Sequence, residues 1–166
     1  MKSVAVALAL LLSATAANAQ EAQVWAVETP KNADAWLRFG TPETDDHPLA
    51  FSCERKSGQV RVAAVVDRKM GVRKDGNAWV DRAGVRAPWP LSISLASEGG
   101  SVTLRSAAEP HDPSGGTMVF TEFSTRAPFT EAFRKSGLVR LTAAGQTIEP
   151  PPAKKSMVRK FLGACK

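Results

Sequence analysis

Apolar and polar residues alternate along most of the chain, and a period of two predicts β-strands. Pro, Asn, Gly and Ser residues, which favour turns, separate the alternating runs. In the run Leu49-Ala50-Phe51-Ser52-Cys53, the first, third and fifth side chains share one face. The first runs form a meander, without the helices that parallel strands need between them. We expect strands at residues 24–28, 35–39, 49–53, 60–66, 91–95, 102–105, 118–123, 138–142 and 147–149.

Two segments have a helical period instead. Phe129 and Phe133 lie four residues apart after Pro128 and predict a short helix that ends at Gly137. Near the end of the chain, apolar residues recur at i, i+3, i+4 and i+7, which predicts an amphipathic helix. These residues are Val158, Phe161, Leu162 and Cys165.

Basic residues lie off the apolar stripe of this last helix, namely Lys155, Arg159 and Lys160. We interpret them as a solvated helix face. Basic residues near a helix C-terminus also suit the helix dipole.

The remaining segments are predicted to be loops and turns. Lys74-Asp75-Gly76-Asn77 is typical of a tight turn, within a turn-rich stretch from residue 68 to 86. Residues 108–116 are rich in Pro, Gly and Asp and are expected to form a loop. Pro150-Pro151-Pro152 ends the last strand, because proline cannot donate to a ladder.

The predicted fold class is mainly β. We expect an antiparallel β-sandwich or curled sheet with a short helix and a C-terminal amphipathic helix packed on it. Cys53 and Cys165 are the two cysteines, and each lies on the apolar face of its element. There is no CxxC pair for a redox role, and a zinc site would need more Cys or His ligands. We therefore predict a structural disulfide between Cys53 and Cys165.

The N-terminus predicts export. Lys2 precedes an unbroken apolar run from Val4 to Leu12, and Ala17-Asn18-Ala19 fits the small-x-small pattern that signal peptidase recognises. The apolar run is too short to remain as a transmembrane anchor. We expect residues 1–19 to be a signal peptide and residues 20–166 to form a single periplasmic or secreted domain.

The net charge and the candidate metal ligands limit the functions that the sequence supports. The net charge of +6 is modest and spread along the sequence, so we expect no nucleic-acid partner and at most a weak attraction to anionic envelope surfaces. His47 and His111 each lie beside acidic residues, and a metal-dependent hydrolase that uses both is one alternative function. Asp and His are also common in turns. We therefore predict no metal ligand, no catalytic residue and no cofactor.

Tryptophan is the residue type that suggests a binding surface. Trp36 is predicted to lie in the core. Trp79 and Trp89 fall in the turn-rich stretch with Arg82 and Arg86, and Trp and Arg dominate binding energies at interfaces. These four residues are candidates for a partner contact, with core filling by both tryptophans as an equal alternative.

The order of motifs also matches a known family. Phe51-Ser52-Cys53 opens a strand, Trp89 to Leu95 is followed by a turn and Val102-Thr103-Leu104, Phe129 to Phe133 precedes Leu138 to Leu141, and Phe161-Leu162-Gly163-Ala164-Cys165 ends the chain. Over roughly residues 24–166 this arrangement resembles the VasI-like family of small periplasmic proteins linked to type VI secretion loci. The stretch from Arg68 to Arg86 departs from it. The resemblance implies an accessory envelope protein without known catalytic residues.

We therefore expect a non-catalytic accessory or binding protein of the bacterial envelope. Its partner would be an envelope protein or a cell-wall component. An inhibitor of an envelope-attacking enzyme such as lysozyme is the alternative from another class. Lysozyme is itself basic, however, and its inhibitors usually present acidic residues.

Overall fold

The computed structural model describes residues 22–112 and 114–166. The predicted signal peptide, residues 1–19, and the predicted first residue of the mature chain, Gln20, lie outside the described residues. Within the described ranges, no helix is both long and apolar enough to cross a bilayer.

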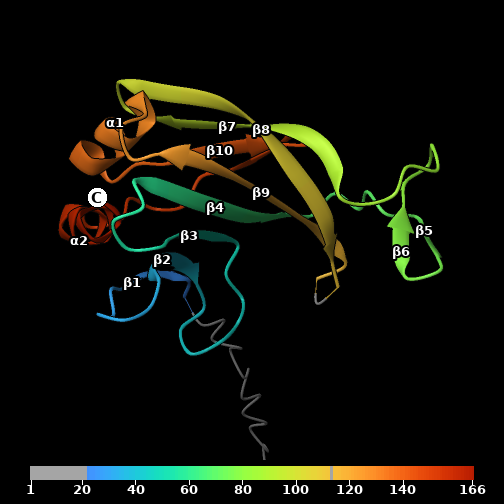
Figure 1. Ribbon diagram of the computed structural model, residues 1–166, viewed down its shortest axis with the longest axis horizontal. Helices are drawn as coiled ribbons and strands as arrows, with labels where there is room; N and C mark the ends of the chain where they lie inside the picture. Colours follow the sequence, from blue (N-terminus) through green and yellow to red (C-terminus); the bar gives the residue numbers. More distant parts are fainter. Residues whose placement is uncertain (1–21, 113) are drawn as a thin grey trace, which may run out of the picture.

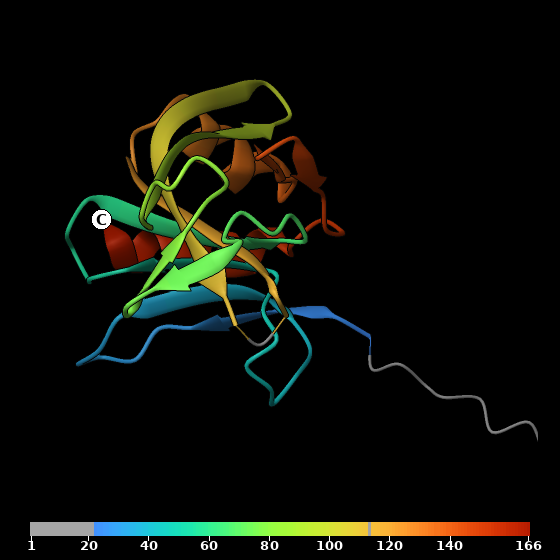
Figure 2. The same cartoon turned by 90° about the vertical axis from the view of Figure 1, so that its right-hand side faces the viewer.

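A nine-stranded antiparallel sheet forms most of the molecule, with its strands in the order β1-β2-β3-β4-β9-β8-β7-β10-β11. The sheet curls into a half-barrel (Figures 1 and 2). The predicted mainly β fold class is therefore confirmed, in its curled-sheet form. The strands are β1 (Val24–Glu28), β2 (Ala35–Gly40), β3 (Leu49–Cys53), β4 (Gln59–Val66), β7 (Trp89–Ser97), β8 (Gly100–His111), β9 (Gly116–Ser124), β10 (Arg140–Ala143) and β11 (Gln146–Ile148).

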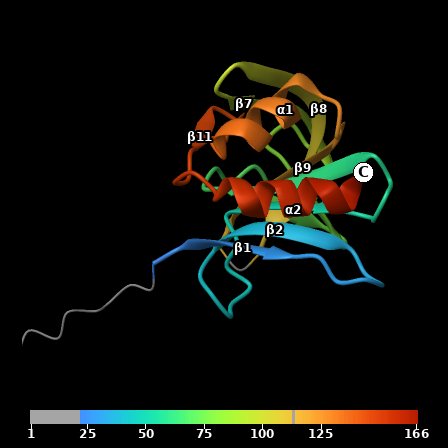
Figure 3. The same cartoon turned by 90° about the vertical axis from the view of Figure 1, so that its left-hand side faces the viewer.

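Two helices, α1 (Pro128–Ser136) and α2 (Lys155–Cys165), cover one end of the curled sheet (Figures 1 and 3). α1 packs against β7 and β8, α2 packs against β1 and β2, and the two helices contact each other. Gly137 ends α1 as predicted, with a φ of 77° that glycine adopts readily, and its N–H donates to the Phe133 carbonyl at 2.8 Å. The space between helices and sheet is filled by aromatic rings: Trp25, Phe39, Phe51, Phe123, Phe129 and Phe133.

The predicted disulfide is confirmed. Cys53 at the end of β3 and Cys165 at the end of α2 are bonded, with 5.7 Å between their Cα atoms. Two backbone hydrogen bonds support the same junction, from Lys56 N–H to the Ala164 carbonyl at 3.0 Å and from Gly58 N–H to the Cys165 carbonyl at 2.8 Å. The bonded residues are 112 positions apart. The chain-entropy model therefore assigns the bond about 4–5 kcal/mol of stabilisation.

β8 is longer than the sequence predicts. The expected loop over residues 108–116 is wrong, because β8 continues through Pro110 to His111. Pro110 pairs with Thr117 of β9, whereas the pairing of β8 with β7 reaches only to Ala108. Beyond Ala108, the other edge of β8 is therefore unpaired within the described residues. Proline is tolerated at such an edge, since no neighbouring strand needs its missing N–H.

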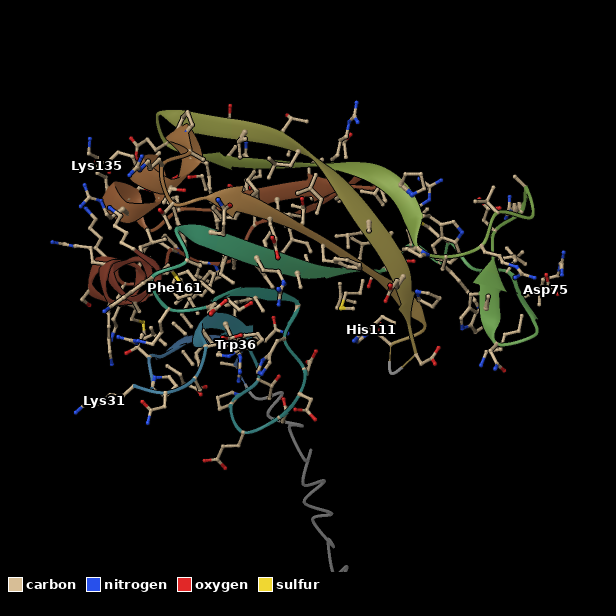
Figure 4. The ribbon with its side chains drawn as sticks, in the orientation of Figure 1. Lys31, Trp36, Asp75, His111, Lys135 and Phe161 are labelled. Carbon is tan, nitrogen blue, oxygen red and sulfur yellow. A yellow bond between two sulfur atoms is a disulfide. The ribbon has the colours of Figure 1, made fainter. Side chains whose placement is uncertain are left out.

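Trp36 lies on the outer face of the sheet, so its predicted place in the core is also wrong. The inner face of β2 is formed by Ala35, Leu37 and Phe39, which are buried. Trp36 and Arg38 are two residues apart and therefore share the outer face. The Arg38 guanidinium carbon lies 4.4 Å from the ring centre of Trp36 (Trp36 is labelled in Figure 4), which makes a cation–π contact at the surface.

Candidate functional site

Between β4 and β7 the chain leaves the sheet and forms a projection, residues 67–88, which we call the arm (Figures 1 and 2). It contains a separate hairpin of β5 (Arg73–Asp75) and β6 (Ala78–Val80). Gly76 and Asn77 connect the two strands, and the φ of Gly76 is 60°. Glycine at the first position of a two-residue connection is typical of a type II′ turn. The sequence predicted this turn but not the short strands beside it.

The arm is fixed to the sheet at its base. Thr117 of β9 is fully buried, and its Oγ1 donates to the Arg68 carbonyl at 2.6 Å and accepts the Met70 N–H at 3.2 Å. The neighbouring Gly116 lies so close to β4 that a Cβ there would be 2.5 Å from the Val66 carbonyl oxygen. The path of the chain from β4 into the arm therefore depends on these two residues of β9.

Two tryptophans hold the arm against the core. Trp89 is 2% exposed, and its Nε1 donates to the Val85 carbonyl at 2.9 Å. Trp79 of β6 is half-buried and packs against the same core. Gly71 runs between them, and a Cβ on Gly71 would lie 3.1 Å from atoms of both indoles. The proposed partner contact of Trp89 is therefore wrong, because its ring faces the core at the start of β7.

The outer surface of the arm is both apolar and basic. Val72 and Val85 are 46% and 49% exposed, and among the described residues Val24 of β1 is the other large apolar residue with such exposure. The arm has three acidic residues and six basic ones, which gives it half of the net charge of the chain. The positive charge is thus concentrated, contrary to our expectation from the sequence. The basic residues are Arg68, Lys69, Arg73, Lys74, Arg82 and Arg86.

One ion pair links the hairpin to the segment after it. Arg86 lies 2.9 Å from the Asp75 carboxylate. The hydrogen bond from Arg86 and its positive charge lower the pKa of Asp75 below the usual 3.8. Asp75 is at the outer end of β5 (Figure 4). Within the described residues, four basic side chains of the arm make neither an ion pair nor a hydrogen bond: Lys69, Arg73, Lys74 and Arg82. Of these, Lys74 lies over the Trp79 ring, with its Nζ 5.2 Å from the ring centre.

Asp81 shapes the loop that presents Arg82. Its Oδ1 accepts the backbone N–H groups of Ala83 at 2.9 Å and of Val85 at 2.8 Å. An Asp side chain that bonds the backbone in this way stabilises a turn. Arg82 and Val85 therefore lie exposed on one ordered loop.

A pocket of about 190 Å³ lies between the arm and the tip of the β8–β9 hairpin, lined in part by Lys69, Trp79 and His111. His111 Nδ1 is 2.8 Å from Ser114 Oγ (Figure 4 shows His111). Nucleophilic catalysis by a Ser–His pair uses an acid to orient the second ring nitrogen. No carboxylate in the described part of the chain hydrogen-bonds to His111.

The two histidines lie on different elements, since His47 is in the loop before β3 and His111 is the last residue of β8. The His47 N–H donates to the Asp45 carbonyl at 3.1 Å, and its Nδ1 is buried without a hydrogen-bond partner among the described residues. Over residues 22–112 and 114–166, no three His, Cys, Asp or Glu side chains are grouped so as to hold a metal ion.

The structure thus brings three of the four predicted contact residues together on the arm. Arg82 and Arg86 are exposed and Trp79 is half-buried. Val72 and Val85 were missed, because an isolated valine in a sequence does not indicate whether its side chain is exposed.

Comparisons with models of protein families, with curated proteins and with solved structures found no match to this chain.

Proposed function

We propose that this protein is a non-catalytic binding protein of the bacterial envelope and that it holds an acidic protein partner through the arm. The N-terminal pattern supports export. The disulfide is consistent with an oxidising compartment outside the cytoplasm. The resemblance to the VasI-like family supports an accessory role.

The observation that carries the proposal is the exposure of Val72 and Val85 beside unpaired basic side chains. Both valines lie on a projection that is fixed to the sheet by the buried Thr117 and Trp89. The fold gains nothing from two exposed apolar side chains, whereas an interface gains from apolar contacts and from arginine. The arm is also ordered before binding, which reduces the entropy lost on association.

The positive charge of the arm indicates that the partner has a negatively charged surface. With six basic and three acidic residues, it attracts a negatively charged surface and repels a basic one. The same charge argues against the alternative of a lysozyme inhibitor, because lysozyme is basic.

The test is capture of a partner from an envelope extract by the processed protein and by two variants. Val72→Ser/Val85→Ser removes the exposed apolar groups of the arm. Val24→Ser is the matched control, since Val24 is 46% exposed but lies on β1. We expect one acidic protein to bind the wild type and the control, and to be lost with the double variant.

Equal thermal stability of the three proteins must accompany this result, since an unfolded variant would also lose binding. A partner that binds the double variant as well as the wild type contradicts the proposal. A third variant, Arg82→Glu, tests the contribution of charge separately from that of the apolar contacts. We expect Arg82→Glu to lower the association rate constant by a larger factor than it raises the dissociation rate constant.

A further inference from the structure

A second basic surface lies on the outer side of α2. Four basic residues precede or lie within this helix, and no acidic residue follows Glu149 in the sequence. All four are exposed, and none takes part in an ion pair among the described residues. We call this surface the cationic face: Lys154, Lys155, Arg159 and Lys160.

The placement of these charges does not help the helix. Lys154 is the residue before the first turn and Lys155 is in it, with no acidic residue in the first turn and no basic residue in the last. The expectation that these basic residues suit the helix C-terminus is therefore wrong, because none of them is in its last turn. Cations at a helix N-terminus oppose the dipole. Lys155 and Arg159 are also four residues apart, a spacing at which like charges repel.

Neighbouring carboxylates do not neutralise the cationic face. The elements that pack most extensively on α2 are α1, β1 and β2, and the disulfide joins β3, which has no acidic residue, to the end of the helix. On α1, Glu131 pairs with Arg134 at 2.8 Å and with Lys135 at 3.3 Å (Figure 4 shows Lys135). On β1, Glu28 pairs with Arg38 of β2 at 3.3 Å. The carboxylates on these elements thus already have basic partners.

The composition of the cationic face differs from that of the arm. The large apolar residues of α2 are buried or half-buried, so its exposed side offers charge without apolar anchors. Protein interfaces take most of their energy from buried apolar and aromatic anchors. Adsorption to a surface of lipid phosphates needs only several basic side chains on one side of the protein.

We infer that the cationic face rests on an anionic phospholipid surface. The attraction is between lysine and arginine side chains and the lipid phosphates, and no part of the chain enters the hydrocarbon. Figure 1 places α2 and the arm at opposite ends of the longest axis of the molecule. Figure 3 shows α2 on the outer surface of the end that it occupies. A protein adsorbed through α2 therefore presents the arm away from the lipid. This inference does not depend on the proposed function, because it uses a different surface.

The test is sedimentation of the processed protein with vesicles. One set contains phosphatidylcholine alone, and a second contains about one-third phosphatidylglycerol, both at low salt. We expect binding to the anionic vesicles only. It should be lost at about 0.5 M salt, where the Debye length falls to a few ångströms.

Two variants that remove the same charge locate the binding surface. Lys155→Gln/Arg159→Gln removes two charges from the cationic face, and Arg73→Gln/Arg82→Gln removes two from the arm. A basic residue near an anionic surface contributes about fivefold to partitioning, so the α2 variant should bind roughly 25-fold more weakly. The arm variant should weaken binding less, because the arm is at the opposite end of the molecule from α2 and its charges are further from the lipid.

Three results overturn the inference. The α2 variant binds as tightly as the wild type, or both variants weaken binding equally, or the wild type binds a soluble polyanion such as duplex DNA but not the vesicles. Equal melting temperatures of the two variants and the wild type exclude loss of folding as the cause of any difference.

Discussion

Replacing Trp89 by alanine tests whether the arm is fixed to the core. Trp89 is 2% exposed and makes one side-chain hydrogen bond, to Val85. A buried tryptophan removes roughly 150–250 Å² from water, and truncation of such a residue to alanine costs about 3–5 kcal/mol. Trp89→Phe keeps most of the ring and loses the hydrogen bond. It should cost about 1–2 kcal/mol, since the Val85 carbonyl is near solvent.

Trp36→Ala is the matched control. It removes the same residue type, but Trp36 is on the outer face of β2 and contacts Arg38 through a surface cation–π interaction. We expect a loss of about 1 kcal/mol.

The assay is urea unfolding followed by far-ultraviolet circular dichroism, in which the midpoint of the backbone transition is compared rather than the amplitude of the signal. Hydrogen exchange over residues 67–88 gives the local readout, and we expect faster exchange there in Trp89→Ala than in Trp36→Ala. If Trp89→Ala unfolds at the same urea concentration as Trp36→Ala, Trp89 does not hold the arm to the core.

The remaining predictions concern the base of the arm, the disulfide and one ion pair. Thr117→Val leaves the Met70 N–H without its partner, so it should cost about 1–3 kcal/mol and speed hydrogen exchange at Met70. Reduction of Cys53–Cys165 should lower the melting temperature, by an amount that corresponds to at most about 4–5 kcal/mol. The folded-state pKa of Asp75 is lowered, so its pair with Arg86 stabilises the protein above the usual carboxyl pKa and is lost as the pH falls through the lower value. The melting temperature of Asp75→Asn should therefore be below that of the wild type at neutral pH, and the difference should vanish as the pH falls through the lowered pKa of Asp75.

The strands that the sequence predicted are those whose faces have opposite environments. β4 is the clearest case, because every second residue from Val60 to Val66 is buried and the residues between them are exposed or half-buried. The periodicity of α2 likewise predicted that Cys165 is buried, and two buried cysteines predicted the disulfide. Here the local pattern and the tertiary environment agree.

The errors arise where tertiary contacts override the local pattern. Pro110 normally ends a strand, but β8 has an unpaired edge at that point. Trp36 is large and apolar, yet the alternation of β2 places it outside with Arg38. In the arm, Gly71 lies between the indole rings of Trp79 and Trp89. The local sequence of Gly, Val and basic residues does not indicate this contact. The arm was therefore predicted as turn-rich chain, without its attachment to the core.

The net positive charge is distributed unevenly over the molecule. Basic residues exceed acidic ones in the arm and on the cationic face of α2, while over the rest of the chain the two types nearly balance. The two basic surfaces lie at opposite ends of the molecule and differ in composition, since the arm adds exposed valines and α2 does not (Figure 1). A charge that served solubility alone would have no reason to be separated in this way. Variants of the arm and variants of α2 should therefore have separable effects, the first on binding of a protein and the second on adsorption to lipid.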